Sequence, residues 1–220
     1  MRRIWAALSA VLLPAAMATA VSSGPAYARP DPTYEAIQLS TLRGPSAVND
    51  RDEVAGIGTA ADGQTHPFIW RDGTMIDLGR PPGAVNWSGV ARDINEQGQV
   101  TGTAIFGGGF VWDRGVMTDL RGPGFTIATA DAINNRGQIV GTFFPPQGGR
   151  NHGYLWQRGT LTDLGEVDPV DINDRGQILA GRETEPSGYQ ACIWQRGHLT
   201  DLDFGPGSRS TTRAGSPASP

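Results

Sequence analysis

The sequence predicts an all-β domain built from four copies of a repeat of about forty residues. A motif ending in Ile-Asn or Val-Asn is followed each time by a Gly-Gln or Asp-Glu turn, a segment ending in Trp, and a segment ending in Asp-Leu. The spacing from this Trp to this Asp is seven residues in every copy. Glycine is abundant, at 31 of 220 residues, as expected for short strands joined by tight turns.

Three positions recur in every copy and form its framework. They are an asparagine (Asn49, Asn95, Asn134, Asn173), a tryptophan (Trp70, Trp112, Trp156, Trp194) and an aspartate (Asp77, Asp119, Asp163, Asp201). The Asn-to-Trp spacing varies between 17 and 22 residues, which places a loop of variable length between them. The spacing from the asparagine to the next framework glycine is seven residues in three copies and eight in the fourth, where the extra residue predicts a β-bulge.

Each copy predicts a four-stranded antiparallel meander. The first strand ends at the asparagine, and a tight turn follows in which Gly98, Gly137 and Gly176 need a positive φ, with Asp52 in their place in the first copy. The third strand ends at the tryptophan. A three-residue loop ending in glycine, as in Arg71–Gly73, then predicts a hairpin with a glycine bulge before the fourth strand.

The third strand of the first copy carries apolar residues on both faces, with Phe68 and Trp70 on one and Ile69 on the other. A sheet covered on both faces has this pattern. Each blade of a propeller lies between two neighbours, so the pattern favours a propeller-like arrangement. A β-solenoid-like stack would give the same pattern and stays open as the alternative.

These motifs are similar to those of a known family. The succession Ile-Asn-x-x-Gly-Gln-Val/Ile-x-Gly, His-x-Phe-x-Trp and Gly-x-Met/Leu-Thr-Asp-Leu-Gly resembles the HAF repeat of predicted extracellular bacterial proteins, over about residues 34 to 203. The resemblance implies an extracellular, β-propeller-like protein and lends no activity or catalytic residue. The chain departs from the pattern where Gly108 and Gln190 replace the histidine and Cys192 replaces the aromatic residue.

Residues 1–28 have the pattern of a signal peptide. Arg2 and Arg3 precede an apolar stretch, and small-x-small cleavage sites end at Ala20 and Ala28, of which we prefer the second. An uncleaved membrane anchor is the alternative. The repeat domain then spans residues 29–203, and residues 204–220 predict a disordered tail. Segment 34–39 predicts an extra strand before the first copy. The sequence therefore leaves two arrangements of the sheets possible, a closed ring and an open array.

Charge and cysteine content narrow the class of protein. The formal net charge is −4, and loss of Arg2 and Arg3 with the signal peptide makes it −6. Such a chain lacks the basic footprint of a nucleic-acid-binding protein, and no segment after the signal peptide is apolar enough to span a bilayer. A lone cysteine, Cys192, leaves the exported domain without an internal disulfide. We expect a secreted monomer.

The framework residues favour structural roles. The repeated tryptophans are expected to pack in the core, and the repeated aspartates to fix turns by accepting backbone N–H bonds. The loop Asp171–Gly176 resembles a calcium loop, but the equivalent turn of the third copy offers no carboxylate. His66 and His152 are equivalent positions without metal-ligand spacing, and Cys192 predicts a small core residue. We therefore predict no catalytic residue, metal or cofactor.

Residues that interrupt the repeat are the better candidates for binding, because loops on a rigid scaffold often carry function. We predict Trp87, Phe144, Arg150 and Tyr189 as exposed ligand-binding residues. The sequence thus favours a secreted, non-enzymatic binding or scaffold module for an extracellular glycan, cell wall or protein. The alternative is an extracellular glycan-cleaving enzyme with its site at the propeller centre, which would need carboxylates converging from different copies.

Overall fold

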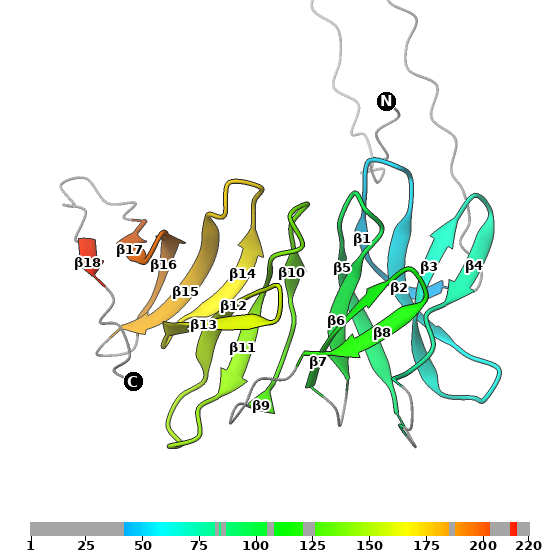
Figure 1. Cartoon of the computed structure of the whole chain (residues 1–220), viewed down its shortest axis with the longest axis horizontal. Coiled ribbons are helices and arrows are strands. Elements are labelled where there is room, and N and C mark those ends of the chain that lie inside the picture. The colour runs from blue at the N-terminus through cyan, green and yellow to red at the C-terminus, as the bar shows by residue number, and fades with distance from the viewer. Residues whose placement is uncertain are drawn as a thin grey trace, which may run out of the picture. The chain divides into compact units, whose positions relative to one another are not determined.

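The computed structural model describes residues 42–81, 84, 87–104, 108–120, 126–184, 188–202 and 212–214, all within a compact unit that spans residues 39–220. Every regular element of these residues is a β-strand, and the strands form four antiparallel sheets (Figure 1). The predicted all-β class and the four repeats are confirmed. The predicted signal peptide and the predicted strand at 34–39 lie outside the described residues.

Each repeat forms one sheet, in which consecutive strands pair in the order of the chain. The first sheet contains β1 (Leu42–Val48), β2 (Val54–Thr59), β3 (Thr65–Arg71) and β4 (Thr74–Asp77). The second contains β5 (Gly89–Ile94), β6 (Val100–Ala104), β7 (Gly108–Asp113) and β8 (Val116–Asp119). The third contains β9 (Thr126–Ile127), β10 (Ala132–Ile133), β11 (Ile139–Phe144), β12 (His152–Gln157) and β13 (Thr160–Gly165), with β9 and β10 both pairing β11. The fourth contains β14 (Asp168–Ile172), β15 (Ile178–Thr184), β16 (Gly188–Gln195), β17 (His198–Asp201) and β18 (Thr212–Ala214).

Strand β18 differs from the expected disordered tail. It pairs antiparallel with β17, and His198 stands opposite Ala214. The edge strand β17 offers free backbone groups, and a strand added to an edge satisfies them. Residues 212–214 of the predicted tail, 204–220, thus form a strand, and the rest of that tail lies outside the described residues.

The tight turns have the predicted positive φ angles but a different hairpin type. Asp52 has a φ of 59° and Gly98 one of 74°, as the sequence predicted. In the hairpin between β3 and β4, Arg71 pairs with Thr74, and the two residues between them, Asp72 and Gly73, both have positive φ. Two such residues define a type I′ turn, whose twist matches that of the flanking strands. The predicted three-residue loop with a glycine bulge is therefore wrong, and the Arg-Gly hairpins of the other three repeats have the same geometry.

The repeated asparagine organises the turn between the first two strands of each repeat. In the third repeat, Oδ1 of Asn134 accepts the backbone N–H groups of Arg136 (3.0 Å) and Gln138 (3.0 Å), while Nδ2 donates to Oε1 of Gln138 at 2.8 Å. The other three asparagines make the same bonds, with Glu53 in place of glutamine in the first repeat. Asparagine suits this position because its side chain offers both an acceptor and a donor.

The same asparagines link each repeat to the next. Nδ2 of Asn49 donates to the backbone oxygen of Asn95 at 3.1 Å, Asn95 donates to Asn134 at 3.0 Å, and Asn134 donates to Asn173 at 2.9 Å. We call this series the asparagine ladder. It is directional, because the earlier repeat always supplies the side-chain donor and the later repeat the carbonyl acceptor.

A second series runs beside the ladder, one residue further along each turn. The backbone N–H of Asp50 donates to Oε1 of Glu96, that of Glu96 to Oδ1 of Asn135, and that of Asn135 to Oδ1 of Asp174, at 2.8 to 2.9 Å. Successive sheets are thus joined three times by the same pair of hydrogen bonds.

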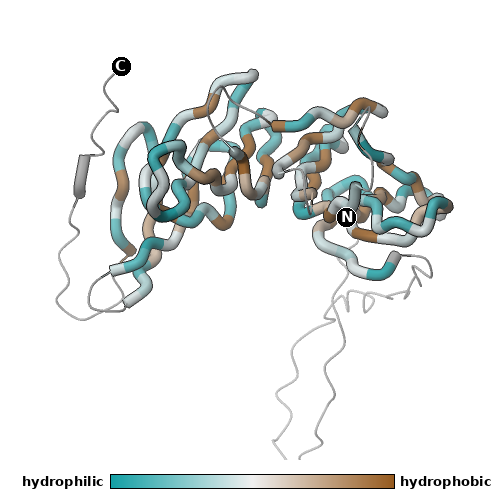
Figure 2. The backbone as a smooth tube through the Cα atoms, turned by 90° about the horizontal axis from the view of Figure 1, so that it is seen from below, coloured by the Kyte–Doolittle hydropathy of each residue, from teal (hydrophilic) through white to brown (hydrophobic). Residues whose placement is uncertain are grey.

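Apolar residues pack between successive sheets. Ala55 of β2 and Ile94 of β5 belong to one cluster, and Val140 of β11 and Ile172 of β14 belong to another. Hydrophobic and hydrophilic positions alternate along the chain where it passes through these sheets (Figure 2). The repeated tryptophans are partly buried, and Trp112, Trp156 and Trp194 pack against these clusters.

The extra residue of the fourth repeat adds no bulge of its own. The register shift between β14 and β15, at Pro169 and Asp171, has counterparts between β1 and β2 and between β5 and β6. Strands β15 and β16 pair without a register shift, and Ala180 stands opposite Cys192, where Gly141 stands opposite Tyr154 in the third repeat. Ala180 therefore occupies the place of the framework glycine. A Cβ atom on Gly102, its equivalent in the second repeat, would lie 2.1 Å from the backbone oxygen of Val90 and 2.6 Å from the ring of Phe110, so that repeat has no room for alanine there.

One charge pair replaces an amide pair in the first repeat. Gln138 donates to Gln157 at 3.2 Å in the third repeat, and Gln177 donates to Gln195 at 3.3 Å in the fourth. In the first repeat the equivalent residues are Glu53, which is buried, and Arg71, and they form an ion pair. Burial acts to raise the pKa of Glu53, but hydrogen bonds from Asn49 and Arg51 and the charges of the two arginines bring it below its usual value.

Replacing both members of this pair is expected to cost less than replacing one. Arg71→Gln leaves the buried Glu53 carboxylate with one arginine and is expected to lower the free energy of unfolding by about 2–3 kcal/mol. The double variant Glu53→Gln/Arg71→Gln recreates the amide pair of the third repeat and should recover at least ~1 kcal/mol of that loss. Urea denaturation of the wild type, both single variants and the double variant measures the coupling, and additive losses would contradict it.

Candidate functional site

Three of the four predicted binding residues lie at the ends of two hairpins, β11–β12 and β15–β16. Phe144 ends β11 and is 52% exposed, and Tyr189 on β16 is 63% exposed. Arg150, in the loop before β12, forms an ion pair with Glu183 of β15. Glu183 stands opposite Tyr189 where β15 pairs with β16. The ion pair between Arg150 and Glu183 therefore links the third repeat to the hairpin that carries Tyr189.

Tyr189 is held in place by two contacts. Its hydroxyl donates to Oδ2 of Asp168 at 3.1 Å. Its ring lies against Gly181, where a Cβ atom would come within 2.3 Å of the phenol oxygen. Partial burial, followed by the charges of Asp168 and Glu183, raises the pKa of Tyr189, so the phenol remains a hydrogen-bond donor. An exposed ring therefore stands at a fixed angle beside a carboxylate.

We call the set Phe144, Arg150, Asp168, Glu183 and Tyr189 the hairpin-end surface. It combines two exposed aromatic rings, one guanidinium group and two carboxylates. Aromatic faces with adjacent hydrogen-bonding groups suit ligands that have both apolar and hydroxylated sides, such as sugar rings. Asp168 and Glu183 were not predicted as binding residues from the sequence. The spacing of Glu183 and Tyr189 around the β15–β16 turn is the signal that places Glu183 beside the ring.

Trp87 does not belong to this surface. Its side chain is only 6% exposed and packs edge-on against Phe110, with ring centroids 5.7 Å apart, and against His66 at 6.2 Å. Its indole also covers Gly89, where a Cβ atom would lie 2.2 Å from the ring. The prediction that Trp87 is an exposed binding residue is wrong, because its indole packs against Phe110, His66 and Gly89.

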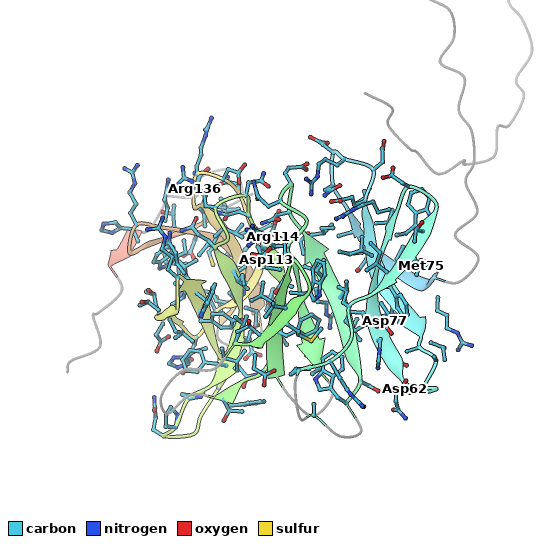
Figure 3. The ribbon with its side chains drawn as sticks, turned by 45° about the vertical axis from the view of Figure 1, so that its right-hand side comes forward. Asp62, Met75, Asp77, Asp113, Arg114 and Arg136 are labelled. Carbon is cyan, nitrogen blue, oxygen red and sulfur yellow. The ribbon has the colours of Figure 1, made fainter. Side chains whose placement is uncertain are left out.

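The repeated aspartates hold the fourth strand of their repeats. Oδ1 of Asp77 accepts the backbone N–H of Gly79 at 2.8 Å, and the same carboxylate bonds Nδ1 of His66 at 2.9 Å. Asp62 approaches the other ring nitrogen of His66, with 3.4 Å between Oδ2 and Nε2 (both acids are labelled in Figure 3). Asp163 and His152 repeat the arrangement of Asp77 and His66 in the third repeat.

The fourth repeat uses an arginine in place of the histidine partner of the aspartate. Gln190 stands at the histidine position, and Arg182 from β15 makes two bonds to Asp201, of 3.0 Å and 2.6 Å. Cys192 beside it is fully buried, and burial, with a further contribution from the Asp201 charge, raises the pKa of its thiol to about 11. A thiol that stays protonated is a poor nucleophile.

Two carboxyl groups on or beside the first strands of the repeats have perturbed acidity. Burial raises the pKa of Asp93 against the opposing effect of backbone N–H bonds from Ile133 and Ile94, and the charge of Asp171 adds to the rise. Burial likewise raises the pKa of Asp131, which accepts a hydrogen bond from Thr129. Both oxygens of Asp93 are engaged by backbone donors at 2.8 Å.

Two shallow depressions lie near the turns. One of about 430 Å³ is lined by Arg51, Arg71, Arg114 and Trp112, with the buried Glu53 at its base. The other, of about 290 Å³, is lined by the Ile-Asn ends of the second, third and fourth repeats, at Ile94, Ile133 and Ile172 and the residues that follow each. Among the residues that the structure describes, no three histidine, cysteine or acidic side chains are grouped so as to hold a metal ion.

Comparison with known proteins leaves the chain without an assigned family. No family model matches the sequence, and no curated protein is significantly similar to it. In the described part of the chain, no helix has the length and apolar character needed to cross a membrane.

Proposed function

We propose that this chain is exported with cleavage after Ala28 and acts as a non-enzymatic binding or scaffold module for an extracellular glycan, cell wall or protein. The observation that carries the proposal is the hairpin-end surface, where the exposed ring of Tyr189 is fixed beside the carboxylate of Asp168. A sugar ring stacked on this face would find acceptors for its hydroxyl groups in Asp168 and Glu183. The resemblance to HAF repeats agrees with an extracellular location.

The propeller-like arrangement of the four sheets belongs to the same proposal. The first strands of the second, third and fourth sheets share one depression, and the charge of Asp171 in the fourth sheet reaches Asp93 in the second. Sheets in a linear stack lie about 10 Å apart, which separates alternate sheets by roughly 20 Å. First strands that converge around a common axis, as in a propeller, explain both observations better.

Binding should depend on Tyr189. We expect the chain, purified from the culture medium of an exporting host and beginning at Arg29, to be retained by insoluble polysaccharides or cell-wall preparations. Tyr189→Ala removes the exposed ring and should lower retention about tenfold or more. The matched control is Val116→Ala, because Val116 on β8 is equally exposed, at 63%, and lies in another sheet. Retention that is unchanged in Tyr189→Ala would remove the hairpin-end surface from the proposal.

The alternative proposal is a glycan-cleaving enzyme with a site at the propeller centre. Asp93 and Asp131 support it, because a carboxyl group with a raised pKa is suited to general acid catalysis. The backbone bonds that occupy both oxygens of Asp93 argue against it. Release of soluble sugar during the same incubation, abolished in Asp131→Asn, would favour the enzyme over the binding module.

A further inference from the structure

The interface between successive repeats is built three times from the same groups. On the earlier repeat, the asparagine Nδ2 and the next backbone N–H act as donors. On the later repeat, the acceptors are the backbone carbonyl of the asparagine and the side chain of the residue that follows the asparagine. A small or apolar residue of the second strand lies between the sheets, at positions Ala55, Thr101 and Val140, all fully buried.

The fourth repeat presents the donor half of this interface to solvent. Within the described residues, Nδ2 of Asn173 bonds only Gln177 of its own turn, and Asn173 is exposed, whereas the other three ladder asparagines are buried. Leu179, the equivalent of Val140, is 37% exposed. Val170 on the adjacent strand is exposed as well.

The first repeat presents the acceptor half. Val48 is 60% exposed, although its equivalents in the other repeats, Ile94, Ile133 and Ile172, are buried against the preceding sheet. The Asn49 carbonyl and the exposed Asp50 carboxylate follow Val48 in the positions that accept hydrogen bonds at the three internal interfaces. The described sheets thus end in two different faces, each of which is the complement of the other.

We propose that the outer face of the fourth sheet binds the outer face of the first sheet in a second copy of this chain. Asn173 Nδ2 then donates to the Asn49 carbonyl, the Asp174 N–H donates to Asp50, and Leu179 packs on Val48. The internal interfaces identify the occupant, because a second copy presents the matching acceptors and apolar residue in the order in which the chain already uses them. The outer face of the fourth sheet also carries Tyr189, whose ring lies on Gly181, two residues after Leu179 on β15. The variant that tests association without touching the hairpin-end surface is therefore Val48→Arg, in the first sheet.

Association of this kind is head-to-tail, so it closes into a ring or extends as a chain of copies. Two copies contain eight sheets, which is within the four to eight blades of known propellers. A closed ring of two copies gives a mass that stops rising at the dimer, and an open chain gives a mass that continues to rise with concentration. Both results support the second copy as the occupant.

Sedimentation velocity over a range of concentrations tests the proposal. The chain purified from culture medium should associate with rising concentration, and Val48→Arg or Leu179→Arg should weaken association at least tenfold with an unchanged melting temperature. Val116→Arg is the matched control, since this equally exposed valine lies on neither end face. A single monomer mass at all concentrations, or association that ignores both face variants, would overturn the proposal.

Mixing the two face variants distinguishes a head-to-tail contact from a symmetric one. A Val48→Arg copy keeps its fourth-sheet face, and a Leu179→Arg copy keeps its first-sheet face. An equimolar mixture should therefore form a dimer with one interface and grow no further, while each variant alone stays monomeric. Dimerisation of either variant alone, or a mixture that stays monomeric, would show a contact of another kind.

Removing one negative charge from the proposed contact between copies should strengthen association, the opposite of the effect expected for the two arginine variants. The proposed contact sets Asp50 of one copy beside Asp174 of the other, whereas the internal contact of Asp174 is with the neutral Asn135. Asp50→Asn keeps an acceptor oxygen and removes the like charge, so association should tighten about two- to fivefold. Weaker association of Asp50→Asn than of the wild type would count against the proposed hydrogen-bond register of the two copies.

Discussion

Replacing Asn134 with alanine is expected to lower the free energy of unfolding by roughly 3–5 kcal/mol, because the side chain makes four hydrogen bonds from a buried position. The variant leaves two backbone N–H groups in the turn, the Gln138 oxygen and the Asn173 carbonyl without this partner. Buried polar groups that lose a partner cost more than the bond itself contributed. Denaturation in urea, followed by tryptophan fluorescence, measures the loss.

Asn173→Ala is the matched control for this prediction. Asn173 makes the same three bonds inside its own turn, donates to no later repeat among the described residues, and is exposed. Its replacement is expected to cost about 1–2 kcal/mol. The difference between the two variants measures the contribution of the asparagine ladder together with burial. Equal losses would mean that the ladder bonds contribute nothing to stability.

Trp87→Ala should lower the free energy of unfolding by about 3–5 kcal/mol, as expected when a buried aromatic side chain is removed from a core. The indole fills the space between Phe110, His66 and Gly89, and alanine leaves that space as a cavity. Thermal unfolding measures the effect. The indole Nε1 is buried and has no hydrogen-bond partner among the described residues, so Trp87→Phe removes this donor and should restore more than half of the loss.

Phe144→Ala serves as the control for Trp87. Phe144 is another large aromatic residue outside the repeated framework, but it is about half exposed on the hairpin-end surface. Its replacement should change the free energy of unfolding by less than ~1 kcal/mol. If Trp87→Ala were as harmless as Phe144→Ala, the packing of Trp87 against the second sheet would be contradicted.

Local features of the fold were predictable because they depend on residues close together in the chain. The positive φ at Asp52 and Gly98 follows from the turn that each occupies, and the strand order follows from the short connections. The type I′ hairpin was missed because Arg71 was counted in the loop, whereas it pairs with Thr74 and leaves only two turn residues. A spacing in the sequence does not show which of the flanking residues pair.

Features that depend on distant partners were not predictable. The ladder joins residues 39 to 46 positions apart, so the repeated asparagine indicated a turn but not its bond to the next repeat. Trp87 lies in a connection outside the repeated framework, which suggested exposure, and its burial depends on the contact of its ring with Phe110. The extra residue of the fourth copy suggested a bulge. The pairing of the strands shows instead that Ala180 stands at the framework glycine position and Cys192 at the position of the aromatic residue opposite it.

The directional ladder also bears on how the length of such a chain can change. Because every repeat recognises its successor with the same groups, the stability of an array is close to a sum of repeat terms and nearest-neighbour terms. A whole repeat can then be gained or lost by duplication or deletion in the gene, and the two repeats brought together already fit. The cost falls on the terminal repeats, which have one neighbour instead of two and are therefore expected to unravel before the interior.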